Sequence, residues 1–237
     1  FSSRYDLVRY DQRGFGRSDP PSAEYAESFD LRQLLDTIGI SSAYFVGLST
    51  GARVALDFAA TFPTRVDGLV VVAPTLQGYR PATPEEEALW AEFDRNEDAI
   101  EAIAKSEGPE RAIEVKVDRW GSALDPRTRA GVIENALDNR ARALGELNPF
   151  RQKLVPATID RLGAIRCPTL VVTGELDFGG FEGIAKLLVD RLPIVQHQVL
   201  AGADHLPNLS QPEAFNALLE QFFARLDFIL MQRGTTW

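Results

Sequence analysis

Ser49 has the residue type and the surroundings of a catalytic nucleophile. It lies at the centre of Gly47-Leu48-Ser49-Thr50-Gly51, after an apolar run that ends at Val46 and before a run of helix-forming residues from Ala52. Gly-x-Ser-x-Gly between a strand and a helix is typical of a nucleophile elbow, a sharp turn that exposes the serine hydroxyl. We expect glycine at positions 47 and 51 because a side chain two residues from the serine would collide across the turn. The alternative is a strand-turn-helix that uses these residues without a catalytic role.

A serine hydroxyl becomes a good nucleophile when a base accepts its proton, and the chain offers two histidines. His197 lies in the middle of an apolar run, where a surface or packing position is expected. His205 lies just after that run, and ligands of open α/β sheets bind beyond the carboxyl ends of the strands. His205 is therefore the predicted base for Ser49.

Three carboxylates lie where they could orient the imidazole of His205. Asp177 follows the end of an apolar run and is the predicted acid. Glu175 is closer to the end of that run, so its side chain has less reach, and Asp204 adjoins His205, from which a neighbouring side chain usually diverges. The order Ser49, Asp177, His205 along the chain is the order of one particular fold.

Short apolar runs that alternate with helical periodicity predict an α/β fold with a mainly parallel sheet, covered on both faces. Because the predicted nucleophile, acid and base each follow a strand, this fold would gather them at one edge of the sheet. The predicted strands are 6–10, 43–46, 66–73, 168–173 and 194–200, and the predicted core helices are 28–38, 52–62, 184–192 and one that begins at 212.

The strand pattern stops between residues 74 and 165, where the sequence predicts a mostly helical insertion. Thr83-Pro84 opens one helix toward Ile103, and Asp125-Pro126 opens another to about Leu144. The predicted domains are a core in two parts and an inserted cap: 1–74 and 166–237 for the core, 75–165 for the cap. Three large rings of the cap are expected to form its own small core, although some could face a pocket below: Trp90, Phe93 and Trp120.

Composition argues against several classes of function. The formal charge of −9 argues against nucleic acid as a partner, and no apolar run reaches the ~18 residues of a membrane helix. Cys167 is the one cysteine, so a disulfide and a cysteine metal cluster are not expected, and a buried thiol is. The start of the sequence does not resemble a signal peptide, which predicts a cytoplasmic location. Gly14-x-Gly16 is not expected to bind a dinucleotide, because Asp19 replaces the third glycine and two prolines follow.

Taken together, these segments resemble the α/β-hydrolase superfamily over almost the whole chain. The loop Asp11-x-Arg13-Gly14-x-Gly16-x-Ser18, the elbow, Gly174-x-x-Asp177 and Asp204-His205-x-Pro207 follow in the family's order. The nearest likeness is to its small esterase, enol-lactonase, metal-free haloperoxidase and C–C hydrolase members. Family dehalogenases and epoxide hydrolases carry Asp at the elbow, and Ser49 argues against both.

The resemblance also implies details that the residues alone do not. It assigns one oxyanion-hole N–H to Thr50, the residue after the nucleophile, and implies no metal and no organic cofactor. Two features depart from the family. Leu48 precedes the serine where small members often carry His or Asn, and Thr50 follows it where they often carry Met. The second departure is that the family's first three strands are absent, together with the His-Gly loop that supplies the second oxyanion donor. We therefore expect an N-terminally incomplete hydrolase that folds poorly or is inactive as residues 1–237.

These observations predict an enzyme of the carboxylic ester hydrolase class. Its substrate would be a small ester, lactone or related acyl compound, attacked by Ser49 with His205 as base and Asp177 orienting His205. The alternatives are C–C bond hydrolysis or perhydrolysis by the same three residues, and a non-catalytic small-molecule-binding protein on this fold. No nucleic acid or membrane partner is expected, and the sequence names neither the substrate nor the oligomeric state.

Overall fold

Four parallel strands form the central sheet, in the order β1-β2-β3-β4. The structure is a computed structural model that describes residues 1–140, 144 and 150–232. Neighbouring strands pair in parallel, for example through Phe45 with Leu69 and through Val71 with Val171. The predicted α/β class with a mainly parallel sheet is confirmed. The strands are β1 (Ala43–Leu48), β2 (Val66–Val72), β3 (Thr169–Gly174) and β4 (Val195–Leu200).

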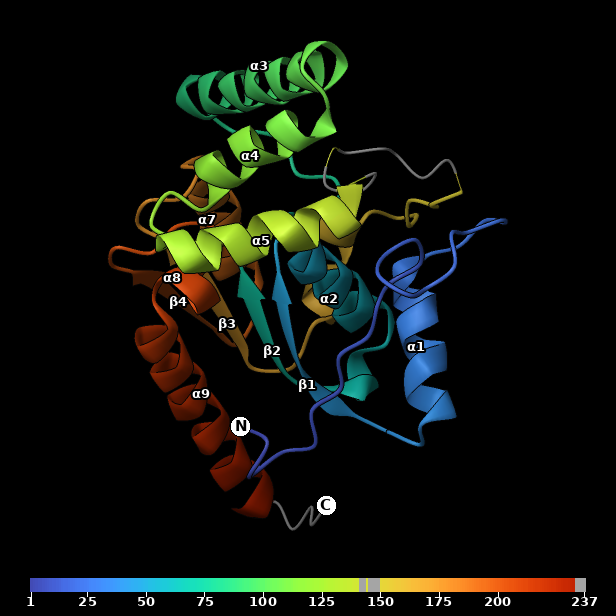
Figure 1. Cartoon of the computed structure of the whole chain (residues 1–237). Helices are drawn as coiled ribbons and strands as arrows, with labels where there is room; N and C mark the ends of the chain where they lie inside the picture. Colours follow the sequence, from blue (N-terminus) through green and yellow to red (C-terminus); the bar gives the residue numbers. More distant parts are fainter. Residues whose placement is uncertain (141–143, 145–149, 233–237) are drawn as a thin grey trace.

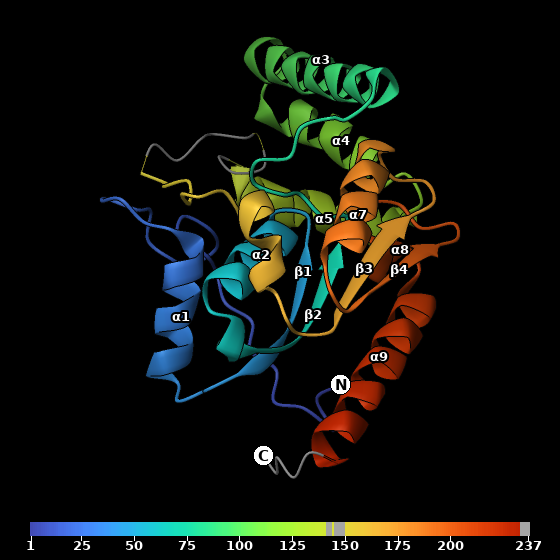
Figure 2. The ribbon, with the colours of Figure 1, turned by 180° about the vertical axis from the view of Figure 1, so that it is seen from behind.

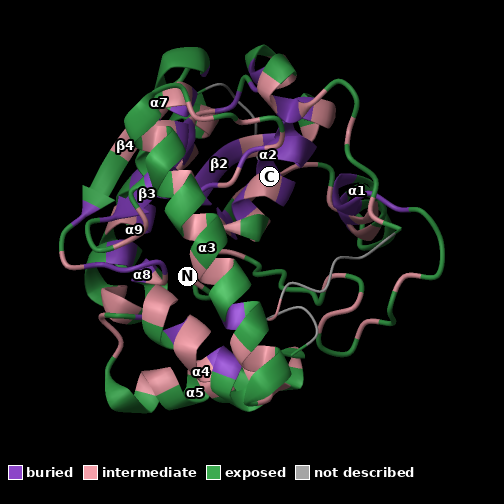
Figure 3. Ribbon diagram, turned by 90° about the horizontal axis from the view of Figure 1, so that it is seen from above, coloured by how far each residue is buried: buried purple, intermediate pink, exposed green. Residues whose placement is uncertain are grey.

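Successive residues of β2 face opposite sides of the sheet, as the two-residue period of a strand requires. Leu69 and Val71 belong to one buried cluster, together with residues of α1 (Glu27–Thr37), α2 (Thr50–Thr61) and α7 (Gly180–Arg191). Val70 and Val72 belong to a second cluster, together with residues of α9 (Pro212–Gln232). The two covered faces can be followed in Figures 1 and 2, and Figure 3 shows that burial concentrates in β2, β3 and α2.

The segment predicted to form the cap contains three α-helices, α3 (Pro84–Ser106), α4 (Pro109–Trp120) and α5 (Pro126–Asp138), placed beyond the tips of the strand arrows in Figure 1. Each begins with proline, whose missing N–H costs nothing at a first helical position. The side chains of Thr83 and Asp125 accept hydrogen bonds from the first turns of α3 and α5. Within 75–165 the described residues form no strand of the sheet, only an isolated bridge of Arg151 to Tyr25.

The cap also differs from the prediction in two places. The helix α4 was not predicted, and it packs against both α3 and α5. The helix predicted to run to about Leu144 ends at Asp138, and residues 141–143 of that prediction lie outside the described residues. The remaining short elements are the 3-10 helices Pro63–Arg65 and Thr158–Ala164 and the four-residue helix α8 (Pro207–Ser210).

The predicted strand from Asp6 to Tyr10 is wrong. These residues have no regular structure, and the side chains expected to be buried are largely in solvent, with Leu7 60% and Val8 48% exposed. In the described sheet β1 pairs with β2 alone, so no strand lies beside residues 6–10 to complete their backbone hydrogen bonds. The preceding residues attach to α9 instead, where the Tyr5 hydroxyl donates to Asp227 over 2.6 Å.

No helix in the described ranges combines the length and the apolar character that crossing a membrane requires.

Candidate active site

Ser49 occupies a strained backbone position at the junction of β1 and α2. Its φ of 54° and ψ of −113° lie where a residue with a side chain is rarely found. The surroundings hold it there. Its N–H donates to the Val72 carbonyl over 2.8 Å, and its own carbonyl accepts from the Arg53 N–H over 3.1 Å. Strain of this kind persists only where the neighbouring structure fixes it, and it gathers at functional sites.

The two glycines of the elbow have different roles. A Cβ at Gly47 would lie 2.4 Å from the carbonyl oxygen of Gly51 and 2.7 Å from the amide nitrogen of Ala52, which are backbone atoms that cannot rotate away. A Cβ at Gly51 would meet nothing within 4 Å. The predicted collision of a side chain across the turn therefore applies to Gly47. For Gly51 the prediction is wrong, because a side chain there would extend into unoccupied space.

Thr50 is the first residue of α2, so its N–H has no acceptor within the helix. The amino end of a helix also carries a partial positive charge, which favours a developing anion. A cavity of about 530 Å³ lies beside it. Burial raises the pKa of the phenol of Tyr10, in this cavity wall, to about 12, so the phenol stays protonated at neutral pH. The cavity is lined by the elbow, the loop after Tyr10 and the cap helix α5: Tyr10, Asp11, Gln12, Phe15, Thr50, Gly51, Asn135, Ala136 and Asn139.

The loop after β4 carries His205 back across the end of β3. The backbone of Ala203 and Asp204 passes so close to Gly174 that a Cβ there would lie 2.4 Å from the Asp204 carbonyl oxygen. The Leu176 N–H donates to the Ala203 carbonyl over 2.8 Å and fixes this crossing. Glycine at the end of β3 is therefore what admits the histidine loop toward the elbow.

Asp177 and His205 form a buried pair. The Nδ1 atom of His205 lies 3.1 Å and 3.0 Å from the two carboxylate oxygens of Asp177, whose side chain is 2% exposed. The Phe178 N–H donates to the same carboxylate over 2.7 Å. With a proton on Nδ1 facing the carboxylate, the assigned tautomer leaves Nε2 free to accept a proton.

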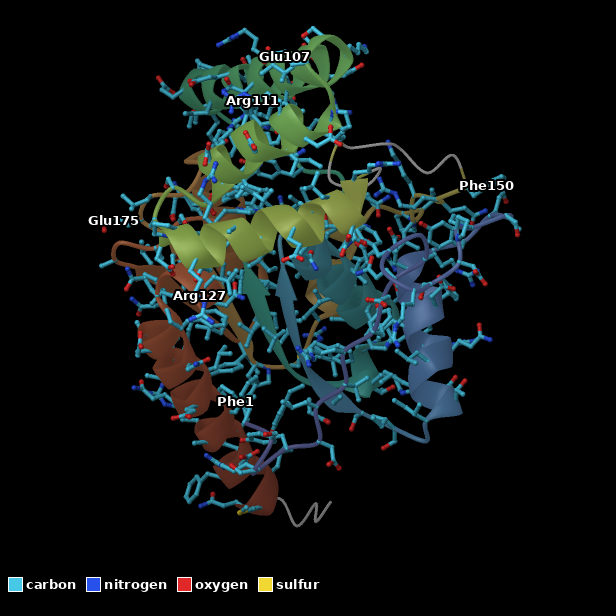
Figure 4. The ribbon with its side chains drawn as sticks, viewed as in Figure 1. Phe1, Glu107, Arg111, Arg127, Phe150 and Glu175 are labelled. Carbon is cyan, nitrogen blue, oxygen red and sulfur yellow. The ribbon has the colours of Figure 1, made fainter. Side chains whose placement is uncertain are left out.

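The two competing carboxylates have other partners. Glu175 accepts from the Gly202 N–H over 2.7 Å and lies at the margin of the molecule, as Figure 4 shows. Asp204 accepts from the Leu206 N–H over 2.9 Å and from the Ala123 N–H over 3.0 Å. Among the described residues, Asp177 is the carboxylate that bonds to the imidazole of His205.

His197 lies within β4, where it was expected to pack or reach the surface. Its Nε2 is 2.9 Å from the Thr173 hydroxyl and 3.9 Å from the Glu182 carboxylate. Both partners belong to β3 and α7, so its position is that of a packed side chain.

Sequence reasoning missed the rings that surround His205. The ring centroid of Trp120, the last residue of α4, lies 4.4 Å from that of the imidazole, and Phe181 of α7 stacks on it at 5.2 Å. Phe93 contacts Trp120 at 5.8 Å and Phe178 at 5.2 Å. The cap rings do pack on one another, as expected, with Trp90 5.4 Å from Phe93, but they do not form a separate core, because they also pack onto Phe178, next to Asp177, and onto α7. Two aromatic pairs at i, i+3 spacing, Trp90 with Phe93 and Phe178 with Phe181, were the sequence signal available for part of this cluster. Trp120 belongs to neither pair.

Ser49 and His205 are not joined by a hydrogen bond in the described part of the chain. The two residues instead share the carboxyl edge of the sheet, after β1 and after β4. Catalytic hydrogen bonds are often long without substrate and shorten when it binds. Across the described ranges, no three His, Cys, Asp or Glu side chains gather as metal ligands do.

Comparison with known proteins places the chain among hydrolases. The sequence model of the Alpha/beta hydrolase family matches residues 1–218. The 2-(acetamidomethylene)succinate hydrolase of Mesorhizobium japonicum is 30% identical over 230 residues, covering 90% of this chain and 76% of its own length.

Solved structures give the same result. A thermophilic esterase from Thermogutta terrifontis is 25% identical, with a TM-score of 0.66 over 90% of this chain and 78% of its own. The enol-lactonase from Burkholderia xenovorans LB400 shares the fold at 22% identity, with a TM-score of 0.69 over 91% of this chain and 79% of its own.

Proposed function

The chain belongs to the alpha/beta hydrolase family and is an enzyme of the hydrolase class, and from this premise we propose that it hydrolyses small acyl substrates through Ser49, His205 and Asp177. The observation that carries the proposal is the buried contact of Asp177 with Nδ1 of His205, at the same sheet edge as the strained Ser49. A carboxylate in that place holds the imidazole in the tautomer that a serine needs.

The proposed reaction has two halves. Ser49 Oγ attacks the substrate carbonyl carbon while its proton passes to Nε2 of His205. The resulting imidazolium, stabilised by Asp177, returns the proton to the leaving group as the tetrahedral intermediate collapses to an acyl-enzyme. Water then attacks the acyl carbon, gives a proton to His205 and releases the acid, with the proton returning to Ser49.

The amino end of α2 is the proposed site that stabilises the oxyanion of each tetrahedral intermediate. The N–H of Thr50 has no acceptor within the helix, which makes it available as an oxyanion donor. One donor of this kind typically contributes about 3 kcal/mol to the transition state.

A small ester or lactone is the proposed substrate class. The cavity of about 530 Å³ reaches from the elbow to the cap, which suits a small molecule. Relatives named as an esterase and as an enol-lactonase share the fold and support this class. The apolar rings beside His205 favour an acyl or leaving group with apolar surface.

Covalent labelling combined with turnover tests the proposal. A fluorophosphonate probe should label the wild-type protein, and Ser49→Ala should abolish both the label and hydrolysis of short-chain p-nitrophenyl esters. The matched control is Ser18→Ala, because the Ser18 hydroxyl donates to the Asp11 carbonyl and has no place in the mechanism. Labelling that survives Ser49→Ala, or disappears in Ser18→Ala, contradicts the assignment.

A further inference from the structure

The loop that carries His205 is fastened to the cap by two hydrogen bonds that run in opposite directions. The His205 N–H donates to the carbonyl of Trp120 over 3.2 Å, and the Ala123 N–H donates to the Asp204 carboxylate over 3.0 Å. We infer that Asp204 is a positioning residue, which ties His205 to the cap segment 120–123 so that His205 is in place only when this segment is seated. The inference rests on the proposed function, since it assigns His205 the part of the base.

Asp204 is unusually placed for a carboxylate. It is 1% exposed, and none of the ion pairs of the described residues includes it. Its charge is met by two backbone donors, the Leu206 N–H on one oxygen and the Ala123 N–H on the other. A buried carboxylate is costly unless it is hydrogen-bonded, and charge-assisted bonds of this type are among the strong ones. One oxygen thus holds the residue after His205, and the other holds the cap.

Trp120 adds a side-chain contact to the same junction. It ends α4, its carbonyl accepts from the His205 N–H, and its ring lies 4.4 Å from the imidazole. Lifting segment 120–123 would therefore remove a backbone bond and a ring contact from His205 together. The other ring contact, from Phe181, belongs to the core helix α7 and would remain.

The effect on catalysis follows from the precision that proton transfer needs. Asp177 sets the direction of Nδ1, but it is a single contact at one end of the ring. The backbone position of His205 is set by the bond to Trp120 and by Asp204. A displacement of about 1 Å at a catalytic group can cost about 10²-fold in rate. Asp204 therefore acts through His205 and needs no contact with substrate.

Turnover of a short-chain ester by matched variants measures this effect. Asp204→Ala should lower kcat by about 10²-fold and leave KM within about threefold, because the pocket beside Thr50 is untouched. Asp204→Asn keeps one acceptor oxygen and should recover part of the loss. The control is Glu175→Gln, which alters a carboxylate on the loop after β3 that bonds to Gly202 of the histidine loop and, among the described residues, forms no side-chain bond with the cap. Its kcat should stay within about threefold of wild type.

A double-mutant cycle tests whether the cap is the partner. Ala123→Pro removes the cap donor and leaves Asp204 intact. Because both changes break the same hydrogen bond, the fold-decrease in kcat of the double variant should be smaller than the product of the fold-decreases of the two single variants. Independent, multiplying losses would overturn the inference. A folded Asp204→Ala whose kcat is within threefold of wild type would overturn it too.

Hydrogen exchange separates this inference from the proposed function. In Asp204→Ala the amides of Ala123 and Leu206 lose their acceptor, and the amide of His205, bonded to Trp120 and not to Asp204, should exchange faster as well. Unchanged protection at His205 would overturn the coupling. A wild-type protein that hydrolyses no ester would refute the proposed function, while the exchange result would still decide the coupling.

Discussion

Two aspartates hold His205 from different sides. Asp177 bonds to its ring at Nδ1, and Asp204 bonds to the backbone on either side of the junction with the cap. The consequences of removing them should differ, because the first controls the tautomer of the imidazole and the second controls where the imidazole sits.

Asp177→Asn should reduce kcat by about 10⁴-fold, since the amide can donate to Nδ1 and so favour the wrong tautomer. Ester turnover at a substrate concentration above KM measures the effect, with Glu175→Gln as the control that stays active. If Asp204→Asn had the 10⁴-fold loss and Asp177→Asn stayed active, the acid would be misassigned.

Cys167 should be chemically silent in the folded protein. Burial raises the pKa of its thiol to about 11, and the side chain precedes β3 in the core. Thiolate is the reactive form, so a thiol reagent at pH 8 should not react until denaturant is added, and then with one group per chain. Stoichiometric reaction of the native protein would contradict this account.

At the residue scale, sequence reasoning succeeds where position along a strand decides the outcome. Ser49, Asp177 and His205 each follow a strand, and parallel strands end at one edge, so their gathering there could be predicted. The contacts of Trp120 could not, because they depend on how a helical insertion folds back, which no period in the sequence encodes.

The elbow is an element whose geometry depends on one glycine more than on the other. Gly47→Ala should destabilise the protein by about 1–3 kcal/mol, because its Cβ would overlap the backbone of Gly51 and Ala52. Gly51→Ala places a Cβ in open space at the second residue of α2 and should be neutral or stabilising by up to about 1 kcal/mol. Urea unfolding of both variants measures the difference, and equal losses would contradict it.

The cap helices should affect substrate preference through α4 more than through α3. Trp120 touches the imidazole, whereas Trp90 contacts Phe178 and Phe181 and shows no ring contact with His205 among the described residues. Trp120→Leu should therefore change the ratio of kcat/KM between acetyl and longer acyl esters.

Trp90→Leu is the matched control for that experiment. It should lower the melting temperature and reduce turnover of all esters in equal proportion. If Trp120→Leu also reduced every ester equally, in step with its melting temperature, Trp120 would be a packing residue only.

Two errors of element prediction have physical causes. Leu7 and Val8 have the apolar character of a strand, but a strand also needs a neighbour to bond with, and none of the described strands lies there. The helix α4 begins at Pro109 after Gly108, a break that resembles the end of a helix more than the start of a second one. Its burial depends on α3 and α5, which the sequence does not place.

At the scale of the whole molecule, a buried charge network joins α1 and α2 to the 3-10 helix Thr158–Ala164, near the end of the segment between β2 and β3. Arg53 bonds to Glu27 and to Asp57, each over 2.8 Å, and Asp57 accepts from the hydroxyl of Thr158, the first residue of that 3-10 helix. Arg53→Met would leave the buried Asp57 without its cation and Glu27 with only the more distant Arg151, 3.9 Å away, and should cost about 3–5 kcal/mol. Urea unfolding measures this, with Arg111→Met as the control for an exposed pair, at most about 1 kcal/mol.

The same variant has a defined pH dependence. Burial raises the pKa of Asp57, against the bonds from Thr158 and Arg53 that lower it. A raised pKa means that the folded state binds the proton more tightly than the unfolded state. Its contribution to stability is present below the ordinary value of 3.8 and is lost as pH rises through the raised pKa. Losing Arg53 raises that pKa further, so the loss of stability in the variant should be smallest near pH 3.8 and should grow as the pH rises through the raised pKa, which urea unfolding at a series of pH values measures.

The expected incompleteness of residues 1–237 stays a prediction, since no observation on the described residues tests it. The division into core and cap at residues 74 and 165 likewise stays a proposal about folding units.

The pairing of β2 with β3 has a consequence for how this protein could evolve. Leu69 pairs with Thr169, so the whole cap is a detour between two adjacent strands. The entropy of closing such a detour grows only with the logarithm of its length, about 0.6 kcal/mol for each doubling. Insertions and deletions in the cap should therefore change the folding free energy of the sheet only slightly. Long-range pairing of this kind nevertheless slows folding. A lineage can exchange the helices above Ser49 and His205 and acquire new substrates while the strands that carry the chemistry stay unchanged.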